Sequence, residues 1–126
     1  MGLLALASAT LALAVSPPAV KYHDPHFGAI LTTPKQQALY YWTVEKRAGG
    51  KIRCIGACAR LWPPLHPRGP VPRHVAGIKG TFGTIRRPDG RRQVTFNGLG
   101  IYTYVHEGPR QVLCNNVNGW FVVRLR

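Results

Sequence analysis

Short apolar and aromatic stretches alternate with glycine, proline and asparagine turns along most of this chain. Beyond the N-terminal segment, no stretch longer than about eight residues shows the apolar period of an amphipathic helix. Aromatic and β-branched residues, which strands favour, are concentrated in short segments that turn residues separate. These segments are the predicted strands: 29–33, 38–45, 81–87, 91–96, 99–105 and 120–125.

Two turn motifs connect the later strands. Asp89 and Gly90 follow a proline between residues 81–87 and 91–96, and this combination predicts a hairpin because it suits the dihedral angles of a tight turn. Asn97 and Gly98 predict a second tight turn, since both residues tolerate a positive φ. This succession of short strands predicts an all-β domain, a small antiparallel barrel or sandwich, after an irregular lead-in at residues 17–27.

The N-terminal segment has a different character. Residues 2–15 are almost entirely apolar, and the run has the length of a signal-peptide core rather than of a membrane span. Residues 12–14 (ALA) have the small residues of a cleavage site, although no Lys or Arg precedes Lys21. We therefore predict a signal peptide or hydrophobic arm at residues 1–20 and a single domain at residues 21–126. A signal peptide predicts export to the periplasm, the cell surface or the medium.

One aromatic segment occurs twice, because ALYYWTVEK (38–46) aligns with GIYTYVHEG (100–108). We predict two pseudo-repeats, at about residues 27–65 and 77–125. Side chains alternate along a strand, so the two aromatic residues of each copy share a face and are expected to pack in the core. Each glutamate is expected to accept backbone N–H bonds or to pair with an arginine. The matched residues are Tyr40, Trp42 and Glu45 in the first copy, and Tyr102, Tyr104 and Glu107 in the second.

A pair of cysteines lies between the two copies. Cys54 and Cys58 are four positions apart, which places them on one face of a helical turn. Pro63 disfavours helical geometry at Trp62, so we predict a short helical turn that ends near Leu61. In an oxidising compartment the two cysteines are expected to form a disulfide. So short a loop predicts a stabilisation of only about 2 kcal/mol.

The alternative for the cysteine pair is a copper site. Soft sulfur ligands suit Cu(I), and His66 is a third donor that could join Cys54 and Cys58. Cys114 is the odd cysteine, and it is either free, bridged to a second chain, or a replacement partner for one of the pair.

Several of these features occur in the order of a known family. The run FGAILTTPKQQALYYWTVEK, the block CIGACARLWPPL, the Asp-Gly hairpin, QVTFNG and NGWFVV resemble the bacterial "secreted repeat of unknown function" family, also described as predicted lipoproteins with a Y-x-[FWY]-x-x-D motif. The resemblance implies export and residence in the cell envelope, and it implies no biochemical activity. It places both aromatic segments in the family motif and puts Trp62, Pro63 and Pro64 in the block between them. Glutamate replaces the motif aspartate in both copies, and there is no lipobox cysteine.

The net charge of the chain indicates which classes of partner it could bind. Seventeen Lys and Arg residues face four acids, and a net charge of +13 creates a field that attracts polyanions. An anionic envelope polymer or a membrane surface fits an exported protein, whereas nucleic acid is expected only if the N-terminus is not a signal. A basic surface that serves solubility alone is the alternative. The predicted surface for an anionic partner is the basic hairpin, with Arg86, Arg87, Arg91 and Arg92.

Common catalytic and nucleotide-binding motifs are absent from the sequence. The sequence therefore predicts an exported envelope protein that is non-enzymatic, has a binding or structural role and uses no cofactor. The second hypothesis is an extracytoplasmic redox or copper-handling protein that uses Cys54 and Cys58.

Overall fold

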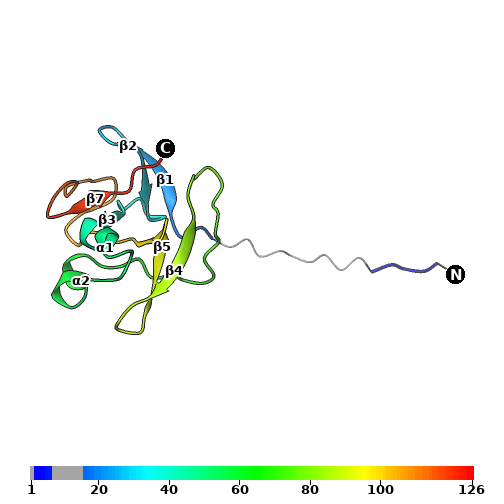
Figure 1. The fold of residues 1–126 in the computed structure, drawn as a ribbon. Coiled ribbons are helices and arrows are strands. Elements are labelled where there is room, and N and C mark those ends of the chain that lie inside the picture. The colour runs from blue at the N-terminus through cyan, green and yellow to red at the C-terminus, as the bar shows by residue number, and fades with distance from the viewer. Residues whose placement is uncertain (1, 7–15) are drawn as a thin grey trace.

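The structure is a computed structural model, and it describes residues 2–6 and 16–126 (Figure 1). Half of the predicted signal peptide or arm at residues 1–20, including the ALA pattern at residues 12–14, lies outside the described residues. None of the helices that the structure describes is long and apolar enough to cross a membrane.

Short strands dominate the described part of the chain. They form three small antiparallel sheets, in the orders β1-β2, β3-β7 and β4-β5-β6, so the all-β prediction is confirmed. In the described residues these sheets do not close into the predicted barrel. In chain order the elements are β1 (Val20–Asp24), β2 (Gly28–Thr32), β3 (Tyr40–Trp42), α1 (Thr43–Arg47), α2 (Ala57–Leu61), β4 (Phe82–Arg86), β5 (Arg92–Phe96), β6 (Leu99–Gly100) and β7 (Trp120–Val122).

The strand β1 corrects the prediction of an irregular lead-in. It pairs with β2 along its whole length, from Val20 opposite Thr32 to Asp24 opposite Gly28. Asp24 closes this hairpin, because its Oδ1 accepts the N–H groups of His26 at 2.8 Å and of Phe27 at 3.0 Å. The sequence VKYHD has mixed strand propensity, so the partner strand, rather than local preference, determines its conformation.

The predicted strand 38–45 is also corrected, because its second half is helical. The strand β3 ends at Trp42 and α1 begins at Thr43, which puts Glu45 on a helix with 1% of its surface exposed. The helix is followed by a tight turn at Gly50, where φ is 89° and an added Cβ would lie 2.7 Å from the carbonyl oxygen of Gly98. Only glycine fits this close approach of two backbones.

Two further predicted strands are shorter than expected. Of residues 99–105, only β6 is regular, and Tyr102 continues the line through isolated bridges to Tyr40 and Pro64. Of residues 120–125, β7 covers the first three, and Val123 then donates its N–H to the carbonyl of Leu39 at 2.8 Å. The Tyr40–Tyr102 bridge links β3 to the residues that follow β6, and the isolated bridges Ile30–Arg124 and Thr32–Ala38 link β2 to the segments beside β7 and β3.

The local turn predictions are confirmed. The hairpin β4–β5 turns at Asp89 and Gly90, where φ of Gly90 is 85° and Oδ1 of Asp89 accepts the N–H of Arg91 at 2.9 Å. Asn97 and Gly98 have φ values of 50° and 81° and join β5 to β6. The helix predicted to end near Leu61 is α2.

The interior consists of two apolar clusters. The first packs the β4–β5 hairpin on β2 and includes Leu31, Phe82 and Val94. The second surrounds the cysteine pair, and Tyr40, Tyr102 and Trp62 lie in it. Figure 1 shows α1 and α2 on the side of the molecule that carries β3 and β7.

Candidate functional site

The two motif tyrosines lie directly opposite each other in the second cluster. Tyr40 donates its N–H to the carbonyl of Tyr102 at 2.8 Å, and Tyr102 donates to the carbonyl of Tyr40 at 3.0 Å. Both residues have 0% of their surface exposed. The prediction that the first aromatic residue of each copy packs in the core is confirmed for both tyrosines.

Each tyrosine hydroxyl donates to the glutamate of the other segment. The hydroxyl of Tyr40 lies 2.5 Å from Oε2 of Glu107, and that of Tyr102 lies 2.7 Å from Oε2 of Glu45. Burial, followed by the adjacent carboxylate, raises the pKa of each tyrosine. Both hydroxyls therefore remain protonated and act as hydrogen-bond donors to the carboxylates.

The carboxylate of Glu45 organises the segment that leads into the disulfide. Its Oε2 accepts the N–H of Arg53 at 2.7 Å and the N–H of Cys54 at 3.0 Å, in addition to the hydroxyl of Tyr102. These bonds link α1 to the start of the cysteine segment. The prediction that this glutamate accepts backbone N–H bonds is confirmed.

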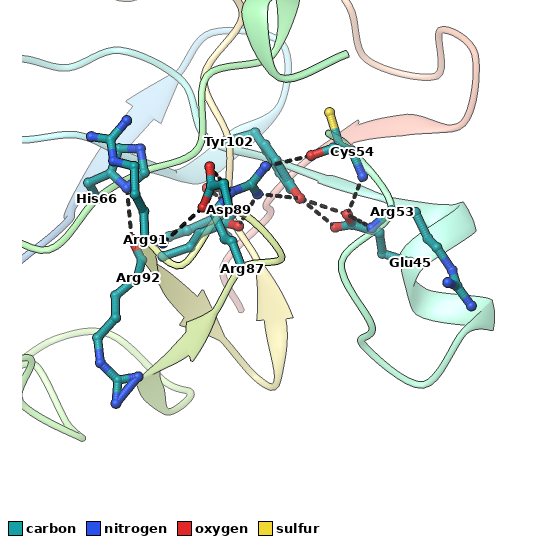
Figure 2. Close-up of polar contacts among 11 residues, drawn as sticks. Glu45, Arg53, Cys54, His66, Arg87, Asp89, Arg91, Arg92 and Tyr102 are labelled. Atoms are coloured by element: carbon teal, nitrogen blue, oxygen red, sulfur yellow. Dashed lines mark hydrogen bonds and ion pairs between the residues drawn. The ribbon is translucent and has the colours of Figure 1, made fainter. Parts of the chain in front are cut away.

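Arg87 lies on the other side of Tyr102 from Glu45 (Figure 2). It has 3% of its surface exposed, and its Nη2 donates to the carbonyl of Cys54 at 2.6 Å. Its Nη1 donates to Oε1 of Gln93 at 2.7 Å and contacts the hydroxyl of Tyr102 at 3.5 Å. The inclusion of Arg87 in an exposed basic surface was therefore wrong, because this side chain is the buried cation of the network.

The sequence itself could have indicated that one of these arginines is buried, because Arg86 and Arg87 are neighbours in a predicted strand. Neighbouring residues on a strand face opposite sides, so a sheet with one buried face cannot expose both side chains. Arg86 does project into solvent, as do Arg91 and Arg92. The remaining basic hairpin therefore has three exposed arginines, with Asp89 exposed at the turn.

Glu107 occupies a different environment from Glu45. Its Oε2 accepts the hydroxyl of Tyr40 and the N–H of Leu113, the latter at 2.7 Å. Its Oε1 is buried and finds no hydrogen-bond partner in the described part of the chain. Burial raises the pKa of Glu107, although the bonds from Tyr40 and from the backbone oppose that shift. Each motif glutamate thus accepts a tyrosine hydroxyl, Glu45 from Tyr102 and Glu107 from Tyr40, but the two differ in their other contacts.

Cys114 is a free and buried thiol in the part of the chain that the structure describes. Burial, and then the nearby carboxylate of Glu107, raise the pKa of this thiol above its ordinary value. A neutral, buried thiol is a weak nucleophile. The sequence left three alternatives for Cys114: a free thiol, a bridge to a second chain, or a replacement partner for Cys54 or Cys58. Within the described chain it is a free thiol, and it does not replace either member of the pair.

All three tryptophans meet in one aromatic stack beside these networks. Trp42 lies 5.1 Å from Trp120 and Trp120 lies 4.0 Å from Trp62, measured between ring centroids, and both pairs are nearly parallel. Tyr104 extends the stack at 4.7 Å from Trp62. Trp62 is 5% exposed, whereas Trp42 and Tyr104, which were also expected in the core, are only partly buried.

The cysteine block is attached to the second motif segment. Cys54 and Cys58 form the predicted disulfide, with Cα atoms 5.1 Å apart. Pro63 accepts the N–H of Thr103 at 2.9 Å, and Pro64 forms a bridge with Tyr102. These contacts place the block between the two motif segments in space as well as in sequence.

The structure does not bring together the residues of the copper alternative. The sulfur atoms of Cys54 and Cys58 are joined to each other, so neither is a thiolate. His66 lies at the far end of the view from Cys54, with its Nδ1 2.7 Å from the carbonyl of Arg92 (Figure 2). Among the described residues no group of three potential metal ligands is found.

Charge is separated sharply between the interior and the surface. Every charged residue lies in the described part of the chain, and sixteen of the seventeen Lys and Arg residues are exposed. Three of the four acids, Asp24, Glu45 and Glu107, are buried in the bonds described above. Asp89 is thus the one exposed acid, and the surface is more one-sidedly positive than the net charge indicates.

The chain was compared with known proteins by family, by sequence and by structure, and no family model, curated protein or solved structure matched it. Both motif glutamates are buried and bonded to tyrosine and backbone, which is the arrangement of a structural element. The exposed cations are the chemically available part of the molecule.

The disulfide gives a testable stability effect. Replacing Cys54 and Cys58 together with alanine should lower the free energy of unfolding by about 2 kcal/mol, because so short a loop restricts the unfolded chain only modestly. Urea denaturation measures this loss. Reductant should destabilise the unmodified protein by the same amount and leave the double variant unchanged. A loss above about 4 kcal/mol would contradict a purely local role.

Proposed function

We propose that this protein is an exported, non-enzymatic module of the cell envelope that binds anionic polymers through its exposed basic surface. The observation that supports this proposal is the separation of charge, with sixteen cations exposed and three of four acids buried. A ligand that approaches from solution meets a nearly uniform positive field, which attracts and retains polyanions. The buried acids are bonded to tyrosine and backbone groups, so an approaching ligand does not contact them.

Export fits the redox state of the cysteines. Disulfides persist in oxidising compartments and are rare in the reducing cytosol, so the Cys54–Cys58 bond supports a location outside the cytoplasm. This support is independent of the apolar run at residues 2–15. The resemblance to the secreted-repeat family, which implies the same location, stays a prediction.

We also propose that the two halves, at about 27–65 and 77–125, are pseudo-repeats that exchange contacts. The supporting observation is reciprocity, since Tyr40 bonds Glu107 whereas Tyr102 bonds Glu45. Two copies related by an approximate twofold axis would place matched residues opposite each other in this way. The antiparallel bridge between Tyr40 and Tyr102 would lie at that axis.

Polyphosphate binding tests the proposed function. Affinity should fall steeply as salt is raised, because each phosphate contact releases counterions. Replacing Arg86, Arg91 and Arg92 together with glutamate should reduce the slope of log affinity against log salt by about 2 to 3. Isothermal titration calorimetry at several salt concentrations measures both quantities.

A matched variant separates the hairpin from the rest of the surface. Replacing Lys21, Lys51 and Lys79 with glutamate makes the same change in net charge at exposed positions outside the hairpin. If the hairpin is the binding surface, this control loses much less affinity than the hairpin variant. Binding that does not respond to salt contradicts the proposed function itself.

A further inference from the structure

A groove of about 680 Å³ lies apart from the tyrosine–glutamate networks. Three described segments form it: the chain entry at residues 16–18, the turn at residues 33–37 and the loop at residues 65–71. Its volume is within the range of about 300–1,000 Å³ that holds small organic ligands. The sequence did not indicate this groove, because the three segments are distant along the chain and none has a binding motif.

The walls of the groove are apolar and stiff. Five of the eleven prolines of the protein line it, and Leu65 and Val71 add aliphatic surface. Proline fixes its own φ, so walls built from it lose little further freedom when a ligand binds. The loop is also anchored to the core, because Leu65 donates its N–H to the carbonyl of Ile101 at 3.0 Å and accepts the N–H of Val94 at 2.8 Å.

The polar groups of the groove are selective for negative charge. Lys35, His66 and Arg68 line it, and no acidic side chain belongs to the described residues around it. A carbonyl oxygen can only accept, so the 2.7 Å contact between Nδ1 of His66 and the carbonyl of Arg92 fixes Nδ1 as the donor. In the neutral imidazole the other ring nitrogen, Nε2, is then an acceptor, so Lys35 and Arg68 are the groups that can bind an anion. Two cations and an anchored imidazole thus occur on an otherwise apolar surface.

We propose that this groove binds a small amphipathic anion. The apolar body of the ligand would lie against the prolines, Leu65 and Val71, while its carboxylate, phosphate or sulfonate would contact Lys35 and Arg68. A ligand of this groove needs both a negative group and an apolar body. The surface proposed for polyanions differs, because it needs negative charge alone. The proposal does not depend on the proposed function, because a polymer does not need an enclosed apolar wall.

Two fluorescent probes that differ in one charged group test the proposal. Anilinonaphthalene sulfonate is an amphipathic anion, and N-phenyl-naphthylamine is its neutral counterpart. Fluorescence titration of the full chain should show that the anionic probe binds at least about tenfold more tightly, because a charge-assisted hydrogen bond is roughly twice as strong as a neutral one. The preference should persist at a salt concentration that releases polyphosphate.

Charge reversal locates the site. The double variant Lys35→Glu, Arg68→Glu should weaken binding of the anionic probe by at least about tenfold and leave binding of the neutral probe unchanged. The double variant Lys51→Glu, Lys79→Glu has the same net charge and should keep both affinities. Amide shifts in a two-dimensional nitrogen–proton spectrum should concentrate at residues 33–37 and 65–71 when the anionic probe is added.

Three outcomes would overturn the proposal. The first is equal loss of anionic-probe binding in both double variants, which would assign the binding to general surface charge. The second is equal affinity of the two probes, and the third is amide shifts that lie away from the groove. Because both variants change exposed side chains, their circular dichroism spectra and unfolding midpoints should match those of the unmodified protein.

Discussion

Replacing Arg87 with methionine should lower the free energy of unfolding by about 3–5 kcal/mol, the range found when one member of a buried charged network is removed. Arg87 donates to the carbonyl of Cys54 and to Oε1 of Gln93, and it contacts the hydroxyl of Tyr102. Methionine fills a similar volume without any donor. Two buried acceptors would then lose their partner, and each such loss costs about 1–3 kcal/mol.

Arg86 supplies the matched control for this prediction. It is the preceding residue on the same hairpin, and its side chain is exposed. Arg86→Met should change stability by no more than about 0.5 kcal/mol, as is usual for surface substitutions. Guanidinium denaturation of both variants, followed by near-ultraviolet circular dichroism of the tryptophan stack, measures the difference. Equal effects of the two substitutions would contradict the buried position of Arg87.

Part of the fold could be predicted from the sequence, because residues within those elements determine their conformation. The hairpin at Asp89 and Gly90 follows from residues within the turn itself, because they pre-set its dihedral angles. The end of α2 at Leu61 follows similarly from Pro63, whereas the expectation that Cys54 shares this helical turn with Cys58 was wrong, because α2 begins at Ala57. Local chemistry decides these elements, so a sequence without an alignment is sufficient to predict them.

Long-range partners decide the elements that were missed. The strand β1 exists because β2 pairs with it, and α1 begins at Thr43 because that turn brings Glu45 to the N–H groups of Arg53 and Cys54. Neither partner can be identified from the local sequence. The groove has the same origin, since its three segments meet only in the folded chain.

The candidate site was predicted in part. The repeat identified Tyr40, Tyr102 and both glutamates as residues with a shared role, and the structure bonds them. The repeat did not show that each tyrosine would bond the glutamate of the opposite segment, because a pattern within one segment contains no information about contacts between segments. It also did not show that the two glutamates differ.

The different environments of Glu45 and Glu107 lead to the second prediction with a large effect on stability. Glu45→Gln should lower the free energy of unfolding by about 2–3 kcal/mol, whereas Glu107→Gln should change it by less than about 1 kcal/mol at neutral pH, and upward. Glu45 accepts two backbone N–H bonds and a tyrosine hydroxyl within a network that contains the buried Arg87. A neutral amide weakens each of these bonds and removes the buried negative charge that accepts the Tyr102 hydroxyl.

Glu107 should behave in the opposite way because its charge is poorly compensated. Its Oε1 is buried without a hydrogen-bond partner among the described residues, and the groups that oppose the rise in its pKa are the Tyr40 hydroxyl and backbone N–H groups, none of them a cation. Burial raises the pKa of Glu107 above its ordinary value of 4.5 in the folded state. Between that ordinary value and the raised one, the folded protein holds a proton that the unfolded chain has lost.

The sign of the pH dependence follows from this proton. The contribution of Glu107 to stability is fully present below the ordinary pKa, and it is lost as pH rises through the raised pKa of the folded state. Glu107→Gln cannot ionise, so it should remove this decline and make stability less dependent on pH above 4.5. Urea denaturation at a series of pH values compares the slopes of the variant and the unmodified protein.

Glu45→Gln is the control for that measurement, since it makes the same chemical change at the matched position of the other segment. It should lower stability at every pH while keeping the decline that Glu107 causes. A loss of the decline in Glu45→Gln, or its persistence in Glu107→Gln, would show that the titration belongs to another group. The paired result would demonstrate that one sequence motif, present in two segments, supplies a fully hydrogen-bonded carboxylate at Glu45 and a carboxylate with an unpartnered buried oxygen at Glu107.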